Sequence, residues 1–198
     1  SSKIFSNYKY GFSFKVPRRW ELDNGRGLFT VFRTFQKDSG ISISVNILES
    51  IDKKVPSPHK VFDELGEVFY KKGIEKQLEN TGVNIKDVFF KKSFFKGFDC
   101  INQEYITSEI LEGFELETLH IGKIFWKQNI QFTIGFNLPK LYYDLKPSYY
   151  DNLIYDFNIL QNYDGVEFID ERLFSVNSKD IRDVNTYDLK SMVEFFIE

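Results

Sequence analysis

The sequence contains a single cysteine, Cys100, and two histidines, His59 and His120. One cysteine excludes a disulfide within the chain. The histidines lie far apart in the sequence, and neither a His-x-His nor a His-Glu-x-x-His pattern occurs, so no zinc site is expected. Cys100 lies in a predicted strand, and its only candidate bases are these distant histidines. A buried structural thiol is therefore favoured over a nucleophile.

Other motifs for catalysis or cofactor binding are also missing. Neither GxGxxG nor GxxxxGK occurs, which removes the usual phosphate-binding loops. Asp99 and Glu104 fall on opposite faces of their predicted strand and so form no acid–base pair. A group of acidic residues near the C-terminus matches no calcium-loop spacing, and a solvated acidic edge is the simpler interpretation. These residues are Asp164, Glu167, Asp170 and Glu171. The sequence thus predicts no catalytic, cofactor-binding or metal-binding residues, and a protein that is not an enzyme.

A strong charge of one sign is lacking as well. The 26 basic and 29 acidic side chains give a net charge of −3, which argues against a nucleic-acid-binding protein with its usual basic face. No apolar run reaches the roughly 18 residues of a membrane-spanning helix. The chain begins Ser1-Ser2-Lys3, without an initiator methionine or an apolar h-region. It is therefore compatible with a mature chain whose signal peptide or lipid anchor has been removed.

Alternating apolar residues predict a sheet that is covered on one side. In the clearest example, Ile130, Phe132, Ile134 and Phe136 share one face, which we expect to pack against a helix. A strand from Phe114 pairs with this one through a turn at Lys127-Gln128-Asn129. Further strands are expected at Phe12–Val16, Leu28–Phe35, Ile41–Ile47, Val83–Phe95 and Phe98–Ile110.

Two helices interrupt this series of strands. Ser57 suits an N-cap before Pro58 at the first helical position, and a stripe of apolar residues continues beyond it at helical spacing. The stripe consists of Val61, Phe62, Leu65, Val68 and Phe69. A second helix is expected at Pro147–Leu160, with Tyr150, Leu153, Ile154, Phe157 and Leu160 inward. Blocks of strands separated by helices predict an α+β fold, with a mainly antiparallel sheet sandwiched by helices.

We divide the chain into a domain at residues 1–160 and a C-terminal extension at 161–198. The extension is too apolar for a solvated linker. Its large apolar residues are Val166, Phe168, Leu173, Phe174, Leu189, Val193, Phe196 and Ile197. We expect it to pack on its own domain, and the alternative is that it docks on a partner or on a second copy in a homodimer.

Three stretches carry a resemblance to a known fold. The first is Tyr10-Gly11-Phe12-Ser13-Phe14-Lys15-Val16-Pro17-Arg18-Arg19-Trp20. The second is the strand Ile41–Ile47 leading to a helix, and the third is Ile130–Phe136 leading to a final helix that ends Asp156-Phe157-Asn158-Ile159-Leu160. Together they resemble the PsbP-like fold from about Tyr10 to Leu160. The resemblance implies an accessory protein that binds other molecules and catalyses no reaction. Members of this group include photosystem subunits, DcrB-type periplasmic lipoproteins and secretion chaperones.

Two groups of residues are candidates for binding a partner. Arg18 and Arg19 lie beside Trp20, and arginine and tryptophan are favoured at interface hot spots. The alternative is a solvated turn with Trp20 as a core residue. Tyr142 and Tyr143 are the second candidate, or else they border the second helix.

The sequence leaves three functional hypotheses. The first is a non-enzymatic binding or assembly protein of bacteria, exported or lipid-anchored in the periplasm or cell envelope, whose protein partner is unidentified. The second is a cytoplasmic chaperone or immunity-type protein that covers a secreted effector. An enzyme with an unrecognised site is the weakest of the three.

Overall fold

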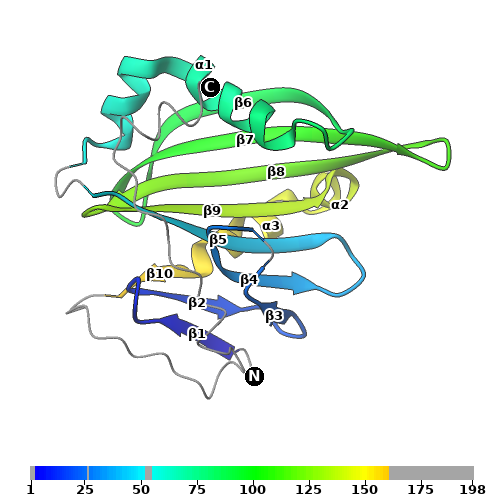
Figure 1. Cartoon of the computed structure of the whole chain (residues 1–198). Coiled ribbons are helices and arrows are strands. Elements are labelled where there is room, and N and C mark those ends of the chain that lie inside the picture. The colour runs from blue at the N-terminus through cyan, green and yellow to red at the C-terminus, as the bar shows by residue number, and fades with distance from the viewer. Residues whose placement is uncertain (1–2, 26, 52–54, 161–198) are drawn as a thin grey trace.

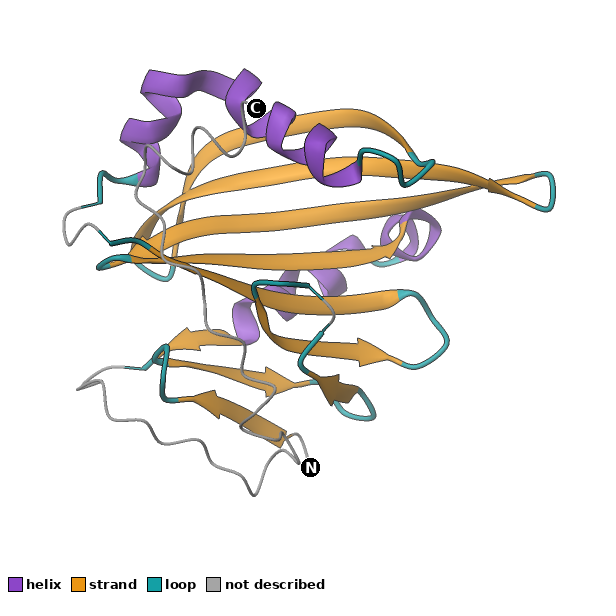
Figure 2. Cartoon of the chain, in the orientation of Figure 1, coloured by secondary structure: helices purple, strands orange, loops and turns teal. Residues whose placement is uncertain are grey.

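Two antiparallel sheets form the framework of the molecule (Figures 1 and 2). The structure is a computed structural model, and it describes residues 3–25, 27–51 and 55–160. The large sheet has, in spatial order, β3 (Glu21–Asp23), β4 (Thr30–Gln36), β5 (Ile41–Glu49), β9 (Ile130–Pro139), β8 (Phe114–Lys127), β7 (Phe98–Leu111) and β6 (Asn84–Phe95). The small sheet has β1 (Lys3–Asn7), β2 (Phe12–Val16) and β10 (Phe157–Ile159). The helices are α1 (Pro58–Leu78), α2 (Lys140–Leu145), α3 (Pro147–Leu153) and the 3₁₀ turn η1 (Ile154–Asp156). The predicted α+β class with a mainly antiparallel sheet is confirmed.

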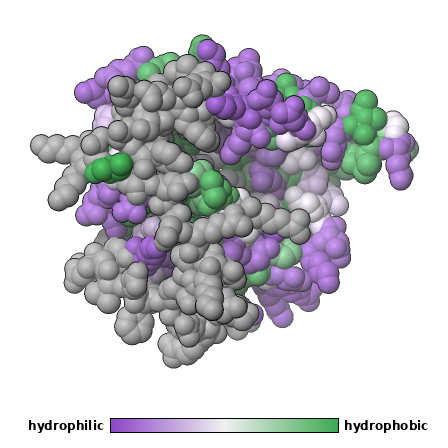
Figure 3. All heavy atoms as spheres, viewed as in Figure 1, coloured by the Kyte–Doolittle hydropathy of each residue, from purple (hydrophilic) through white to green (hydrophobic). Residues whose placement is uncertain are grey.

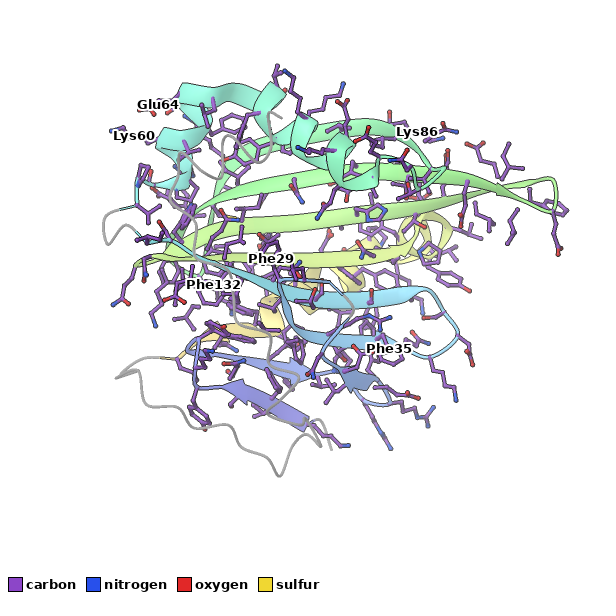
Figure 4. All side chains as sticks on the ribbon, in the orientation of Figure 1. Phe29, Phe35, Lys60, Glu64, Lys86 and Phe132 are labelled. Atoms are coloured by element: carbon purple, nitrogen blue, oxygen red, sulfur yellow. The ribbon has the colours of Figure 1, made fainter. Side chains whose placement is uncertain are left out.

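The alternation of β9 places its apolar face in the main core. Phe132 and Ile134 are fully buried, whereas Ile130 beside the turn is only half-buried. The prediction that this face packs against a helix holds for Phe136, whose ring lies 6.0 Å from that of Tyr150 on α3. It is wrong for Phe132, which lies between the two sheets (Figure 4), with its ring 6.1 Å from that of Phe12 in β2. A second sheet therefore supplies part of the cover that we assigned to a helix.

Helix α1 begins as the sequence predicts but is interrupted in the middle. The Ser57 hydroxyl accepts a hydrogen bond from the Lys60 amide, and Pro58 occupies the first turn. Gly66 then adopts φ 71° and ψ 179°, which breaks the helical path. The break rotates the second half of the helix, so that Val68, a member of the predicted stripe, is 64% exposed while Ile74 is buried. The helix continues through Gly73 to Leu78.

The second helix is shorter than predicted. α3 ends at Leu153, and after one 3₁₀ turn the chain enters β10, where Phe157 pairs with Phe14 of β2. Phe157 and Ile159 alternate about Asn158, and the free edge of β2 allows this segment to extend as a strand. We also placed the start of β4 two residues too early, and did not predict β1, β3 or α2. The predicted extension at 161–198 lies outside the described residues.

Helices cover both faces of the large sheet. On one face α1 lies over β6, β7 and β8, and closes a small core of Ile74, Phe90, Ile101, Tyr105 and Ile124. On the opposite face α3, η1 and the small sheet close the main core, which contains Phe12, Phe132, Leu153, Ile154 and Phe157. No helix among the described residues is long and apolar enough to cross a membrane.

Candidate protein-binding surface

The hairpin of β7 and β8 is longer than the strands on either side of it. Pairing of β6 with β7 begins at Asn84 and Ser108, and pairing of β8 with β9 ends at Thr118 and Pro139. Residues 109–117 therefore form a two-stranded ribbon that projects from the sheet (Figure 1). We refer to these residues as the β7–β8 ribbon. At its end, Glu112 (φ 52°) and Gly113 (φ 84°) both have positive φ, as a tight two-residue hairpin turn requires.

The end of the ribbon is apolar and exposed. Its large apolar side chains are between 46% and 76% exposed, and they are Ile110, Leu111, Phe114 and Leu116. Figure 3 shows hydrophobic residues gathered at this projecting end. An isolated two-stranded ribbon is marginally stable in water, and a contiguous exposed apolar patch usually marks an interaction site. The ribbon is thus the clearest candidate contact element among the described residues.

Carboxylates flank the apolar tip of the ribbon. Four glutamates lie in or beside its strands, and Lys86 of β6 contacts two of them, Glu115 at 3.4 Å and Glu117. Figure 4 shows Lys86 near the base of the ribbon. Its single positive charge offsets part of the negative charge of these two glutamates. Glu112 in the turn and Glu109, which lies opposite Leu116, make no ion pair with any other described residue. The tip therefore presents apolar side chains with net negative charge.

A second exposed apolar area lies at the base of the ribbon, where α2 contacts β8 and β9. Its four large side chains are between 41% and 71% exposed, and they are Leu141, Tyr142, Leu145 and Tyr149. We refer to these four residues as the α2–α3 surface. A pocket of about 410 Å³ opens beside it and is lined by Leu145, Lys146, Pro147, Ser148 and Tyr149.

The predicted partner site at Arg18, Arg19 and Trp20 is fully exposed only at its two arginines. Arg18 and Arg19 are exposed in a turn closed by a hydrogen bond from the Trp20 amide to the Pro17 carbonyl. Trp20 packs against the main core, which agrees with the simpler alternative for that residue. A binding role for Arg18, Arg19 and Trp20 stays a prediction.

The predicted tyrosine pair divides between two environments. Tyr142 is exposed on α2 and belongs to the α2–α3 surface. Tyr143 is half-buried against the main core, and its hydroxyl donates a hydrogen bond to Asp151 at 3.0 Å. Burial is the main cause that raises the pKa of Tyr143 to about 12, and this hydrogen bond is the second. Tyr142 is therefore the member of the pair that is open to a partner.

The residues considered for catalysis form no thiol–histidine pair in the described chain, although the His59 Nδ1 lies 3.7 Å from an Asp99 carboxylate oxygen. Cys100 is fully buried, and this burial raises the pKa of its thiol to about 11. The His59 Nε2 lies 3.1 Å from the Cys100 carbonyl oxygen and 2.8 Å from that of Ser93, so its ring holds α1 on the sheet. The ring nitrogens of His120 lie 2.7 Å from the side-chain oxygens of Thr107 and Asn137. Each side chain has a structural role here, and the described residues contain no group of three potential metal ligands.

Lys123 is a buried cation that we did not predict from the sequence. Lys123 is 8% exposed, and its ammonium donates a hydrogen bond to Asn102 at 3.0 Å. The same ammonium lies 5.5 Å and 5.8 Å from the ring centroids of Phe95 and Tyr155. Burial lowers the pKa of Lys123. A signal was present in the sequence, because Lys123 occupies the same strand face as the buried Phe125 two residues later.

Comparison with known proteins identifies the fold. No protein-family model matches the sequence, and no curated protein matches it. The solution structure of cyanobacterial PsbP (CyanoP) from Synechocystis sp. PCC 6803 is similar with a TM-score of 0.61 and 17% identity, over 80% of this chain and 92% of that one. LpqN, described as involved in cell envelope biogenesis of Mycobacterium tuberculosis, gives a TM-score of 0.46 and 14% identity, over 81% and 85%. The similarity to CyanoP shows that the protein has a PsbP-like fold, as the sequence resemblance indicated.

Proposed function

We propose that this protein is a non-enzymatic binding or assembly protein, exported or lipid-anchored at the cell envelope, which acts through contacts with other protein chains. The observation that carries this proposal is the β7–β8 ribbon, an unsupported extension of the sheet whose large apolar side chains are exposed. Exposure of such side chains in water is unfavourable, and burial against a partner removes that cost.

The location of the exposed side chains supports a defined surface. Sixteen large hydrophobic residues of the described chain are exposed, and eight of them belong to the ribbon or to the α2–α3 surface. These two elements lie next to each other, because α2 contacts β8 at the base of the ribbon. Scattered exposed apolar residues are normal for a folded protein, whereas a concentration of them favours an interaction site.

The chemistry of the described residues favours binding over turnover. The single thiol is buried and has a raised pKa, and both histidines are used in structural hydrogen bonds. The hydroxyl of Thr107 lies 2.7 Å from the His120 Nε2, but Thr107 is buried, and a substrate would have to reach such a nucleophile–base pair for turnover.

A photo-cross-linking experiment tests the proposed contact surface. A benzophenone analogue of phenylalanine replaces Phe114 at the ribbon tip, and the protein is expressed and irradiated in cells of its natural source. The control carries the same analogue in place of Phe89, which is 55% exposed on the edge strand β6. We expect discrete protein adducts from position 114 that are absent from position 89. Equal labelling at both positions, or none at 114, would contradict the proposal.

The envelope location has its own test. The genomic sequence upstream of Ser1 should encode a signal peptide, with or without a lipid-attachment cysteine. A start codon immediately before Ser1 would instead favour a cytoplasmic protein and remove this part of the proposal.

A further inference from the structure

We propose that the ribbon tip binds the pocket beside the α2–α3 surface of a second copy of the same chain, and that two copies exchange this contact reciprocally. The inference rests on the proposed function to the extent that the ribbon binds protein, and it names the partner. The tip and the pocket are complementary in shape and in charge, and both are apolar.

The tip is suited to insertion into a pocket. Leu111 lies directly opposite Phe114 across the turn, so the two side chains share one face of the ribbon. Phe114 is 73% exposed, and nothing on the described chain shields it. Glu112 in the turn carries a negative charge at the extreme end of the ribbon. The matching site must therefore be apolar and must offer a cation at its edge.

The pocket at the junction of α2 and α3 has these properties. Leu145, Pro147 and Tyr149 contribute apolar walls, and its volume of about 410 Å³ leaves room for an aromatic side chain. Lys146 is exposed at the same pocket and makes no ion pair with any other described residue, whereas Lys140 nearby is paired with Asp144 at 2.6 Å. The Lys146 ammonium is thus available to a carboxylate from outside.

The positions of tip and pocket allow a closed dimer. The pocket lies near the base of the ribbon, because α2 contacts β8 there, and the tip lies at the far end. Two ribbons that run antiparallel therefore bring each tip toward the base of the other. A twofold axis makes both contacts at once, as an isologous interface requires. The same tip and pocket without a twofold would build an open chain of molecules.

The charge of the tip disfavours an anionic membrane as the alternative. Basic clusters are the usual signature of binding to acidic lipids, and the ribbon carries Glu109 and Glu112 beside its apolar residues. An unrelated protein with an apolar, basic-rimmed pocket remains the competing occupant. It is distinguished from a second copy by the measurements below, which use the purified 198-residue chain alone.

The test is analytical ultracentrifugation of the protein over a wide range of concentration. We expect a reversible monomer–dimer equilibrium that weakens as salt is added. Phe114→Ala should weaken dimerisation about tenfold or more, as loss of a central apolar anchor does. Phe89→Ala, which removes an equally large exposed ring outside the surface, should leave the equilibrium unchanged. Thermal melting of the variants shows whether each one is folded, and all of these side chains are exposed.

A charge exchange tests the pairing itself. Glu112→Lys and Lys146→Glu should each weaken the dimer, and the double variant should restore most of the loss. A mixture of Phe114→Ala and Lys146→Glu proteins should associate more strongly than the same pair of changes combined in one chain, because the mixed dimer keeps one intact contact.

Three results would overturn the inference. They are a monomer at every concentration, a dimer that ignores Phe114→Ala and Lys146→Glu, and a double variant no better than the single ones. If the protein is monomeric while Phe114 cross-links to a different protein in cells, the second copy is wrong and the proposed function stands. If neither self-association nor cross-linking occurs, both are wrong.

Discussion

The ring of Phe132 stacks on that of Phe125 in the neighbouring strand, with centroids 5.2 Å apart and an angle of 9° between the planes. Both rings are fully buried, and Phe157 of β10 lies within 6 Å of each. The three rings together therefore join the large sheet to the small one. The burial of Phe132 follows directly from the alternation of apolar residues in β9.

Phe132→Ala should reduce the free energy of unfolding by about 3–5 kcal/mol, because the change leaves a cavity among rings that cannot all move to fill it. Chemical denaturation of the two proteins measures this loss. Phe89→Ala, at an exposed site, is the matched control and should change stability by less than about 0.5 kcal/mol. A loss below about 1 kcal/mol at Phe132 would mean that the register of β9 is wrong.

Gly66→Ala should destabilise the protein by roughly 1–2 kcal/mol. The backbone at Gly66 has φ 71°, where a Cβ is unfavourable for an L residue, and no atom lies within 4 Å of the position of that Cβ. The cost is therefore one of backbone conformation and not of crowding. Gly73→Ala, in the regular second half of α1, should instead stabilise the protein by up to about 1 kcal/mol. Thermal unfolding of both variants checks the opposite signs.

Cys100 should be inert in the folded protein. Its thiol is fully buried and has a pKa of about 11, so little thiolate forms and reagents cannot reach it. Reaction with a disulfide reagent at neutral pH should be very slow until denaturant is added.

Metal analysis and assays with ester, phosphate and glycoside substrates test the absence of catalysis. Stoichiometric zinc, or turnover that is abolished by Cys100→Ser or His120→Gln, would contradict the non-enzymatic proposal.

His120 should make stability depend on pH. Burial lowers its pKa from the ordinary value of 6.5, against a smaller opposing effect of the hydrogen bond to Asn137. The unfolded chain therefore takes up a proton near pH 6.5, while the folded protein takes it up only at lower pH. The stability due to the neutral ring is present above pH 6.5 and decreases as pH falls through that value. Denaturation at several pH values should show this decrease, and His120→Gln should reduce it.

The main core could be predicted from the sequence because period-two alternation reports burial directly. Ile41, Ile43, Val45 and Ile47 are all buried, as is Phe132 on the adjacent strand. The ends of the helices and strands depend on contacts with neighbouring elements, and the spacing of apolar residues does not encode these contacts. Phe157 suits a helical stripe as well as a strand, and the free edge of β2 decides between them.

The candidate contact surface was mostly out of reach of sequence reasoning, although Tyr142 was among the predicted residues. Leucine and phenylalanine are residue types that usually lie in a core. Leu111 and Phe114 are exposed because β6 and β9 end before the β7–β8 hairpin does. Relative strand length is a tertiary property. In the same way, the turn of Gly66 exposed Val68, which the apolar stripe of α1 placed inside.

The C-terminal extension offers the last prediction. Truncation after Leu160 preserves β10, whose end is held by a hydrogen bond of 2.8 Å from the Leu160 amide to the Gly11 carbonyl. We expect the truncated protein to melt at a lower temperature and to bind more of a hydrophobic dye, because the apolar residues of 161–198 should cover part of the domain. An unchanged melting temperature together with loss of self-association, or of a protein cross-linked in cells, would show instead that the extension is an interaction element. A control variant that removes 187–198 alone tests a short amphipathic helix that the sequence predicts at Tyr187–Ile197, with Leu189, Val193, Phe196 and Ile197 inward. If that variant already shows the full loss, the stabilising contact lies in this helix and not in the segment from 161 to 186.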